Sequence, residues 1–467
     1  MKLTQEAINY GMQQLTRLAG FGPLKPDQIY QKYKLRIHYG KQEGKNPEIN
    51  TVYITPCENS DWESILNLLP GRMEWMQCQR LFPNDKPSVR IKSLPVLFWG
   101  KEQRDVNKPI AEIIDNHVII FHVDLIATII FMLTRWEEVI QDVRGVHNRF
   151  PASASLAYKQ NFLDRPIVDE YALVFQTWVK KILPSWQPQK TQASLWLTHD
   201  IDHLNEYASL YSFGKQVLKS IFRLQGLKHL RYIIEEFIKV NRDLTQGRYY
   251  QSALTLSNLD KKHNYKSTFF FQASKRTHFD SGYDPSRSEI QGLFKEISSS
   301  NHEIGLHIGY YSYDNEERIR KEFTRLRPLI KQTSIGVRSH YLRFRVPHSW
   351  RFFSNTGLAY DCTMGYAEYE GFRCGTCHPF NPFDLERNKK IDITEIPLIV
   401  MDGTLKNYRH MNIQEAEERI LTLAKRCKNV GGVFTLLWHN TNIDGEWIAW
   451  GELYKRILTK LKKLFYP

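Results

Sequence analysis

The sequence predicts a distorted parallel (β/α) barrel preceded by a smaller α+β domain. Strands and helices alternate from residue 193 to the end, as in parallel α/β folds. The run 266–271 is almost continuously apolar, which is typical of a strand that is covered on both faces. The 467 residues are also too many for one ordinary core, so two or three domains are expected.

The first 150 residues mix short strands and helices. Strand composition marks 50–55 and 94–99, and an apolar face predicts one helix over 124–140. A second helix is expected over 165–185. The polar stretch 184–192 contains two prolines and is the predicted domain boundary. We therefore expect an N-terminal domain over 1–150, a helix and linker over 151–192, and the barrel over 193–467.

The barrel is predicted from alternating segments. Its expected strands are 193–198, 266–271, 303–307, 335–338, 394–400 and 433–438. Its expected helices are 252–263, 288–299, 316–330, 350–356 and 413–428, with a helical insertion at about 205–245. Gly357 marks the end of one helix as a C-cap.

The formal net charge of +14 favours anionic partners such as nucleic acid, anionic lipid or an acidic polymer. No nucleic-acid motif accompanies this charge. The basic residues are densest over 455–463 and over 213–242, where they are Lys215, Lys219, Arg223, Lys228, Arg231, Lys239 and Arg242. Both stretches carry apolar residues at helical spacing. This pattern indicates amphipathic helices with solvated faces, or a surface that contacts an anionic membrane.

The six cysteines show no paired spacing, and 374–377 is a lone C-x-x-C for which a loop turn is the expected structure. The first residues lack an apolar signal core, and His122 and Asp124 interrupt the longest apolar run, 117–133. We therefore expect a cytoplasmic protein, with contact at the inner face of the membrane as an alternative.

Polar residues stand at the ends of several predicted strands. Asp200 and Asp202 lie two residues apart, so both point to one face if the chain is still extended there. His307, Arg338 and His439 end later strands. Because the C-terminal ends of barrel strands meet at one mouth, these groups predict a divalent-metal site with a general base. For the two aspartates, an Asx turn that closes the strand is the alternative.

The order of these motifs resembles the polysaccharide deacetylase family (carbohydrate esterase family 4). Thr198-His199-Asp200 is similar to the Thr-Phe-Asp of its first motif, and 302–307 to the lead-in and first histidine of its second. The resemblance covers 193–467 and implies that Asp200 is the general base, with Asp202 left open for that role. The segments 133–138, 149–152 and 164–167 resemble, more loosely, a domain that accompanies some bacterial deacetylase-like proteins.

Two positions depart from the family pattern. Ile201 stands where the metal-binding aspartate is expected, and Tyr311 stands where the second histidine is expected. The first departure either moves the carboxylate ligand by one residue, to Asp202, or removes it. We expect Asp202 and His307 to be ligands of zinc, with nickel, cobalt and manganese as alternatives.

The third ligand is expected to be His340, since it follows the next strand and would face the same mouth. His203, beside Asp202, is the alternative.

The resemblance also implies two catalytic residues. Arg345, in Arg345-Val-Pro-His, is assigned to orient the base, and His439 to protonate the leaving amine. The residues assigned to substrate binding are Arg338, Arg343, Tyr311 and Trp350. For Trp350, core packing is the alternative.

Together these features predict a metal-dependent hydrolase that removes an N-acetyl group, or less readily an O-acetyl group, from a sugar. The expected substrate is an acetylated sugar, a lipid-linked glycan or a polysaccharide. One alternative is a non-catalytic glycan-binding or assembly protein derived from a deacetylase. A nucleic-acid-binding protein is a further alternative that rests on charge alone.

Overall fold

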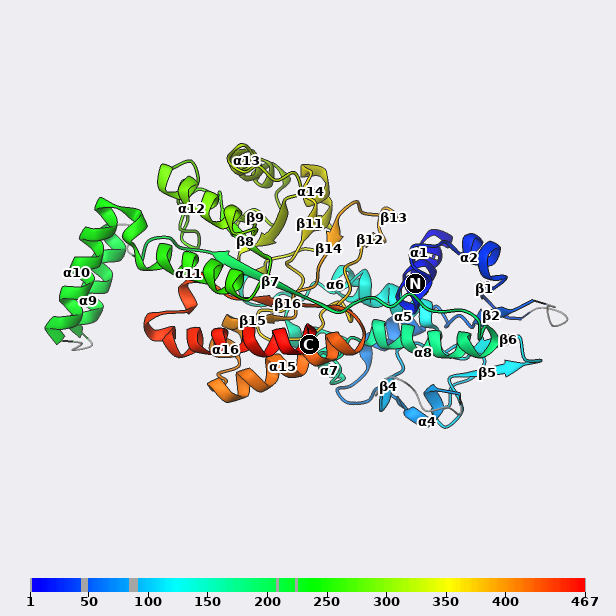
Figure 1. Cartoon of the computed structure of the whole chain (residues 1–467). Helices are drawn as coiled ribbons and strands as arrows, with labels where there is room; N and C mark the ends of the chain where they lie inside the picture. The colour runs from blue at the N-terminus through cyan, green and yellow to red at the C-terminus, as the bar shows by residue number, and fades with distance from the viewer. Residues whose placement is uncertain (1, 43–48, 84–90, 207–209, 223–225, 467) are drawn as a thin grey trace.

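One eight-stranded parallel sheet forms the centre of the larger part of the molecule (Figure 1). The computed structural model describes residues 2–42, 49–83, 91–206, 210–222 and 226–466. In spatial order the strands are β14 (Thr394–Glu395), β11 (Tyr360–Asp361), β10 (Gly336–Ser339), β9 (Glu303–Ile308), β8 (Ser267–Gln272), β7 (Ser194–Ile201), β16 (Val433–Leu437) and β15 (Val400–Met401). All six residues of β8 are buried, as the apolar run predicts.

The sheet curls because one short segment joins its two edges. β14 ends at Glu395 and β15 begins at Val400, yet these strands lie at opposite ends of the strand order. The four residues 396–399 can span only about 14 Å, so the two edges lie close together. The fold is thus a distorted (β/α) barrel preceded by an α+β region, which confirms the predicted fold class.

The single strand expected over 394–400 is therefore wrong. Pro397 lies in its middle and has no N–H to donate to a ladder, and the chain crosses from one edge of the sheet to the other at this point.

Helices surround the barrel. They are α11 (Arg248–Lys262), α12 (Ser288–Ser299), α13 (Glu316–Leu326), α14 (His348–Thr356), α15 (Ile413–Asn429) and α16 (Ile448–Phe465). Asn412 caps α15 by accepting a hydrogen bond from the Glu415 amide, and Gly357 ends α14 in the left-handed region at φ 84°. Helices α11 to α15 agree with the predicted segments to within a few residues, and α16 contains the basic stretch 455–463 but begins earlier.

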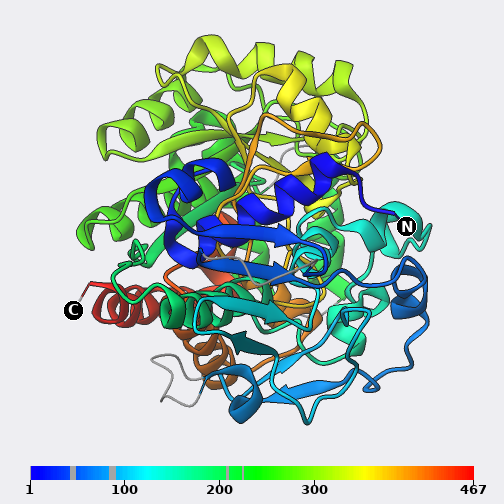
Figure 2. The same ribbon diagram turned by 90° about the vertical axis from the view of Figure 1, so that its right-hand side faces the viewer.

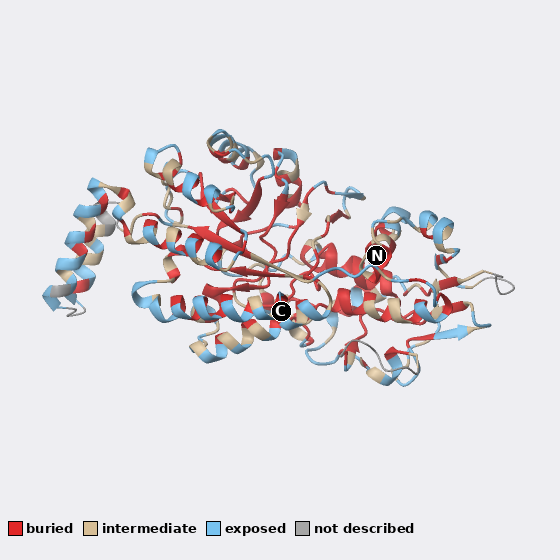
Figure 3. Ribbon diagram, viewed as in Figure 1, coloured by how far each residue is buried: buried red, intermediate tan, exposed pale blue. Residues whose placement is uncertain are grey.

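The insertion between β7 and α11 forms two helices, α9 (Leu210–Phe222) and α10 (Gly226–Arg242), that project away from the barrel (Figure 1). They pack on each other through the rings of Phe213 and Phe237, whose centroids lie 4.1 Å apart. Figure 3 shows that most of this hairpin is exposed.

The N-terminal part has its own four-stranded sheet, in the order β1 (Arg36–Tyr39), β2 (Thr51–Ile54), β6 (Val118–Phe121) and β5 (Ala111–Ile114), with only β5 antiparallel. Within this part, β3 (Trp75–Gln77) pairs with β4 (Ser93–Pro95). A further small pair, β12 (Phe383–Asp384) with β13 (Lys389–Lys390), belongs to the later part of the chain. The helices of the N-terminal part are α1 (Gln5–Thr16), α2 (Pro26–Tyr33), α3 (Asp61–Ser64), α4 (Cys78–Leu81), α5 (Leu125–Leu133), α6 (Trp136–Ile140), α7 (Leu156–Lys159) and α8 (Ile167–Ile182).

The helix expected over 124–140 is two helices. The chain turns at Arg135, which has a left-handed backbone with φ 52° and separates α5 from α6. The Arg135 guanidinium is fully buried and pairs with Glu137 and Glu138, and these ion pairs accompany the break.

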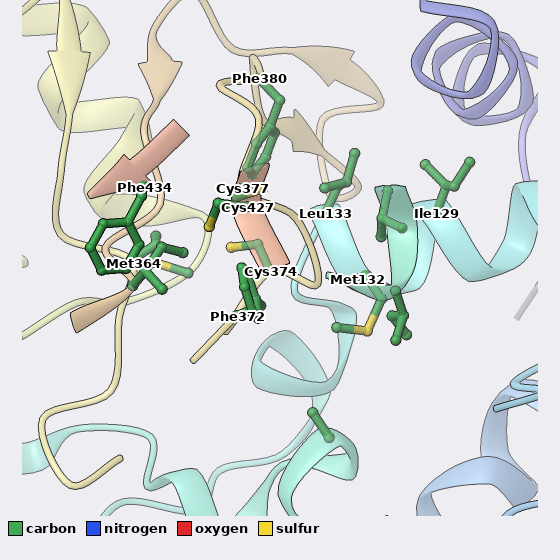
Figure 4. Packing of buried hydrophobic residues seen from close by; sticks show 14 of the residues in the cluster. Ile129, Met132, Leu133, Met364, Phe372, Cys374, Cys377, Phe380, Cys427 and Phe434 are labelled. Carbon is green, nitrogen blue, oxygen red and sulfur yellow. The ribbon is translucent and has the colours of Figure 1, made fainter. Parts of the chain in front are cut away.

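The N-terminal part packs against the barrel (Figure 2) and shares one continuous buried cluster with it. Figure 4 shows Met132 and Leu133 of α5 beside Cys374, Cys377 and Phe372. The C-x-x-C stretch is a loop, as expected, and both its thiols are buried and free. The domain boundaries near residues 150 and 192 stay a prediction.

None of the helices in the described ranges combines the length and the apolar character needed to cross a bilayer.

Candidate metal and catalytic site

Three donor side chains meet at the mouth of the barrel. Asp202 follows β7, His307 lies in β9 and His340 follows β10. One ligand atom from each lies within 4.8 Å of the others. The Asp202 Oδ1 atom is 3.0 Å from His307 Nε2 and 3.6 Å from His340 Nε2. The structure thus brings together the three residues that the sequence assigns to the metal.

Both histidines are held in the tautomer that suits a metal ligand. The His307 Nδ1 atom lies 3.0 Å from the Arg338 carbonyl oxygen, and His340 Nδ1 lies 2.8 Å from Asp280 Oδ1. A carbonyl or a carboxylate oxygen only accepts, so each Nδ1 carries a proton, and Nε2 is the nitrogen of each ring that faces the site and can bind a metal once it carries no proton.

The donor set fits a tetrahedral divalent ion. With metal–ligand distances of about 2.0–2.1 Å, neighbouring ligand atoms in a tetrahedral zinc site lie about 3.3 Å apart. The observed separations of 3.0 and 3.6 Å lie on either side of that value. Two imidazoles and one carboxylate leave a fourth position open, as catalytic zinc sites require.

The charge balance at Asp202 favours its ionised form. Burial alone would raise the pKa of Asp202, but His340, His307 and His439 outweigh burial and hold this pKa well below its ordinary value. A carboxylate that stays ionised is the form that binds a cation.

A second carboxylate lies beside the ligand group. Asp200 ends β7, is almost fully buried, and places Oδ2 3.7 Å from His307 Nε2. Its Oδ1 atom lies 3.5 Å from Nε of the fully buried Arg338, whose Nη2 donates to Thr198 Oγ1. Asp200 Oδ1 has no hydrogen-bond partner within the described structure, and Oδ2 is the oxygen that lies nearest to His307 and His439.

A histidine–aspartate pair faces Asp200 from the other side. His439 Nδ1 donates to Asp402 Oδ1 at 2.7 Å, and its Nε2 lies 4.0 Å from Asp200 Oδ2 and 3.8 Å from Asp202 Oδ2. Burial alone would lower the pKa of His439, but Asp402, Asp202 and Asp200 together raise it to about 10. This shift favours the protonated imidazole, which is the form that can donate a proton.

The site opens into a pocket of about 270 Å³. Phe279, Tyr341 and Tyr408 line it with aromatic rings, and Arg149, which precedes the barrel, also lines it. Arg149 Nη1 donates to the Tyr341 carbonyl oxygen at 2.9 Å. Tyr341 has a left-handed backbone with φ 62°, a conformation that costs energy and is common at functional sites. The segment before the barrel thus contributes to the wall of the site.

Two of the expected site residues lie elsewhere. Arg345 is exposed ahead of α14, and the arginine beside Asp200 is Arg338, because β10 and β7 bring these two side chains into the barrel interior. Trp350 is fully buried and donates to Glu395 Oε2 at 2.8 Å, so it packs in the core and cannot form the wall of a groove.

The other expected residues lie near the site but outside the ligand group. Arg338 is enclosed beneath Asp200 and is thus not open to a substrate. Arg343 lies between the rings of Tyr310 and Tyr313, at 4.0 and 4.1 Å from their centroids. Tyr311 is exposed and lines a neighbouring cavity. His203 lines the pocket rim and is not in the ligand group.

Sequence reasoning missed Asp280 and Asp402, the carboxylates that orient His340 and His439. Asp402 directly follows β15, so the strand-end argument that selected Asp200 would also have found it. Asp280 lies in a loop after β8, and no local pattern in the sequence marks it.

Comparisons with known proteins gave one family model and a distant structural similarity. A family model described as "Family of unknown function (DUF7033)" matches residues 4–184. A solved structure described as "putative polysaccharide deacetylase from Mycobacterium smegmatis" is similar at 15% identity and a TM-score of 0.36. That similarity covers 58% of this chain and 86% of the other. No curated protein matches the sequence.

Proposed function

We propose that this protein is a metal-dependent hydrolase that removes an N-acetyl group from a sugar. The observation that carries this proposal is the convergence of Asp202, His307 and His340 on one point, with Asp200 on one side and the His439–Asp402 pair close by. This arrangement supplies metal ligands, a general base and a general acid within one pocket.

The chain's own residues have separate roles in the proposed reaction. A divalent metal held by the three ligands would polarise the acetyl carbonyl and the attacking water. Asp200 accepts the proton of that water, and Arg338, 3.5 Å from its Oδ1 atom, orients the carboxylate. His439, already protonated, gives its proton to the departing amine as the C–N bond breaks. Asp402 stabilises the His439 cation until that transfer.

The pocket walls support a sugar as the substrate. The rings of Phe279, Tyr341 and Tyr408 offer flat apolar faces of the kind on which a sugar ring can pack. Zinc is the proposed metal, with nickel, cobalt and manganese as alternatives, because two imidazoles and a carboxylate bind all of these ions.

The first test is the metal content of the purified protein and of three variants. We expect near-stoichiometric metal in the wild type and its loss in both His307→Ala and His340→Ala. His38, an exposed histidine of β1, provides the matched control, and His38→Ala should keep the metal. Retention of metal in His340→Ala would assign the third ligand to another residue, with His203→Ala as the next variant.

The second test is turnover of acetylated chito-oligosaccharides. Asp200→Asn should keep its metal and lose about 10²- to 10⁴-fold in kcat, because it removes the base and not a ligand. A wild-type protein that binds no metal even after supplementation would overturn the hydrolase proposal and favour a non-catalytic glycan-binding protein.

A further inference from the structure

The α9–α10 hairpin exposes large apolar side chains near its free end. Phe222, the last residue of α9, is 84% exposed, and Leu227, at the start of α10, is 85% exposed. Leu218 is also exposed and lies on the same side of α9 as Phe222, four residues before it, and the neighbouring Ile221 is exposed as well. Ile234 and Ile238 continue an exposed apolar row along α10.

These side chains are not needed to hold the hairpin together. Its interior already contains the stacked rings of Phe213 and Phe237 together with the buried residues Ile233 and Val240. The exposed row is therefore a second apolar surface, which the described part of the chain leaves uncovered.

The same hairpin is strongly basic. Residues 210–242 contain seven lysines and arginines and two glutamates, for a net charge of +5. The exposed cations are Lys215, Lys219, Arg231, Lys239 and Arg242, while Arg223 lies outside the described residues. A projecting pair of helices that combines exposed aromatic and aliphatic side chains with cations matches the apolar and anionic layers of a bilayer surface.

We infer that the α9–α10 hairpin docks the protein on an anionic lipid bilayer. Phe222 and Leu227 enter the interface between headgroups and acyl chains. Lys219, three residues before Phe222, and Arg231, four residues after Leu227, are the exposed cations placed to contact the lipid phosphates. The charge complementarity selects this occupant over a second copy of the chain, since two such hairpins each carry a charge of +5 and repel one another.

Docking in this way brings the candidate active site to the membrane surface. A cavity of about 590 Å³ lies between hairpin and barrel, with Lys219, His229 and Tyr232 from the hairpin on one side and Trp447 on the other. His203, Thr441 and Asn442 line both this cavity and the pocket of the metal site. If the proposed function holds, the substrate is accordingly a glycan carried on a lipid.

The test is co-sedimentation of the full-length protein with vesicles of phosphatidylcholine alone or mixed with phosphatidylglycerol. We expect binding that requires phosphatidylglycerol and weakens as salt is raised. Phe222→Ser/Leu227→Ser should bind about tenfold or more weakly, because it removes the two side chains that leave water. Lys215→Glu/Lys219→Glu should also weaken binding and reduce its salt dependence.

The matched control is Leu69→Ser/Ile140→Ser, which removes two exposed apolar side chains from the N-terminal part. This variant should bind vesicles as the wild type does. Equal binding by the control and the Phe222→Ser/Leu227→Ser variant, or absence of binding to anionic vesicles at low salt, would overturn the inference. A concentration-dependent dimer that the Phe222→Ser/Leu227→Ser variant abolishes would instead identify a second copy as the occupant.

The two proposals fail in distinguishable ways. Metal content and turnover of a soluble acetylated oligosaccharide test the active site without any membrane. Vesicle binding tests the hairpin without any turnover, and His307→Ala, which should lose the metal, should bind vesicles as well as the wild type does.

Discussion

Asp280 is a loop residue whose carboxylate fixes the orientation of His340. Its Oδ1 accepts from His340 Nδ1 at 2.8 Å and from the Tyr310 amide at 2.9 Å. Partners of this kind hold a ligand histidine in place and raise its basicity. Asp280 is therefore a positioning residue for the proposed metal.

Asp280→Asn should lower metal affinity about 10- to 100-fold, since the amide is a weaker partner for the imidazole N–H. A zinc-chelator competition assay measures this change. Asp260→Asn is the matched control, because Asp260 pairs with the buried His199 away from the ligands. The control should lose stability but keep its metal affinity, and an equal loss of affinity in both variants would contradict the role of Asp280.

For individual residues, the sequence predicted the proposed metal ligands better than the residues that orient them. Asp200, Asp202, His307 and His439 could be placed at one mouth because parallel strands end there together. Arg345 was wrongly preferred to Arg338, since a motif match cannot tell an exposed loop arginine from one enclosed in a strand. Asp280 depends on a contact between segments 60 residues apart, which no local pattern records.

Among the elements, α13 is tied to the end of β9 by one buried carboxylate. Glu322 accepts from the Gly309 amide at 2.9 Å and from Ser312 Oγ at 2.5 Å. Burial raises its pKa from an ordinary 4.5 to about 7, although these two hydrogen bonds act in the opposite direction.

The native state therefore holds a proton on Glu322 that the unfolded chain releases at lower pH. The free energy of unfolding should fall as pH rises from 4.5 to 7, by about 3 kcal/mol in total from this group. Glu322→Gln keeps an accepting oxygen but cannot ionise, so its stability should change less over that range. Urea unfolding of both proteins at several pH values measures the difference, and parallel pH profiles would contradict this prediction.

Element types were predictable where the hydrophobic period was clear, as in α12 and β8. The two elements that were predicted wrongly, over 124–140 and 394–400, depend on contacts with distant parts of the chain. The break between α5 and α6 occurs at Arg135, which forms buried ion pairs, and the periodicity of 124–140 gives no sign of it. The split between β14 and β15 depends on which strands the segment 394–401 pairs with.

For the whole molecule, buried charges join the N-terminal part to the barrel. Arg373 donates from Nε to Glu138 Oε1 at 2.9 Å and from Nη2 to Oε2 at 2.5 Å, while Arg135 contacts both Glu138 and Tyr366. These groups are almost fully buried, so each depends on its partner for the loss of hydration. The two parts should therefore unfold together.

Arg373→Met should lower the free energy of unfolding by about 3 kcal/mol or more, because Glu138 loses one of its two cationic partners inside the protein. Denaturant unfolding, followed by tryptophan fluorescence, measures this loss. Lys321→Met breaks the exposed pair with Glu317 and should cost less than about 1 kcal/mol. Similar losses in the two variants would show that the Arg373–Glu138 pair adds nothing to the junction.

The short crossing from β14 to β15 also affects how the protein behaves among its own copies. An open sheet ends in strands whose free N–H and C=O groups can pair with another chain, and such edges promote aggregation. Here the outer side of β14 pairs with Phe380, whose amide donates to Glu395 at 3.0 Å. Beside β15, the Gly371 amide donates to the Ile399 carbonyl at 2.9 Å. Both ends of the sheet are thus covered by the same chain, which protects the barrel against the edge-to-edge association that open parallel sheets must otherwise avoid.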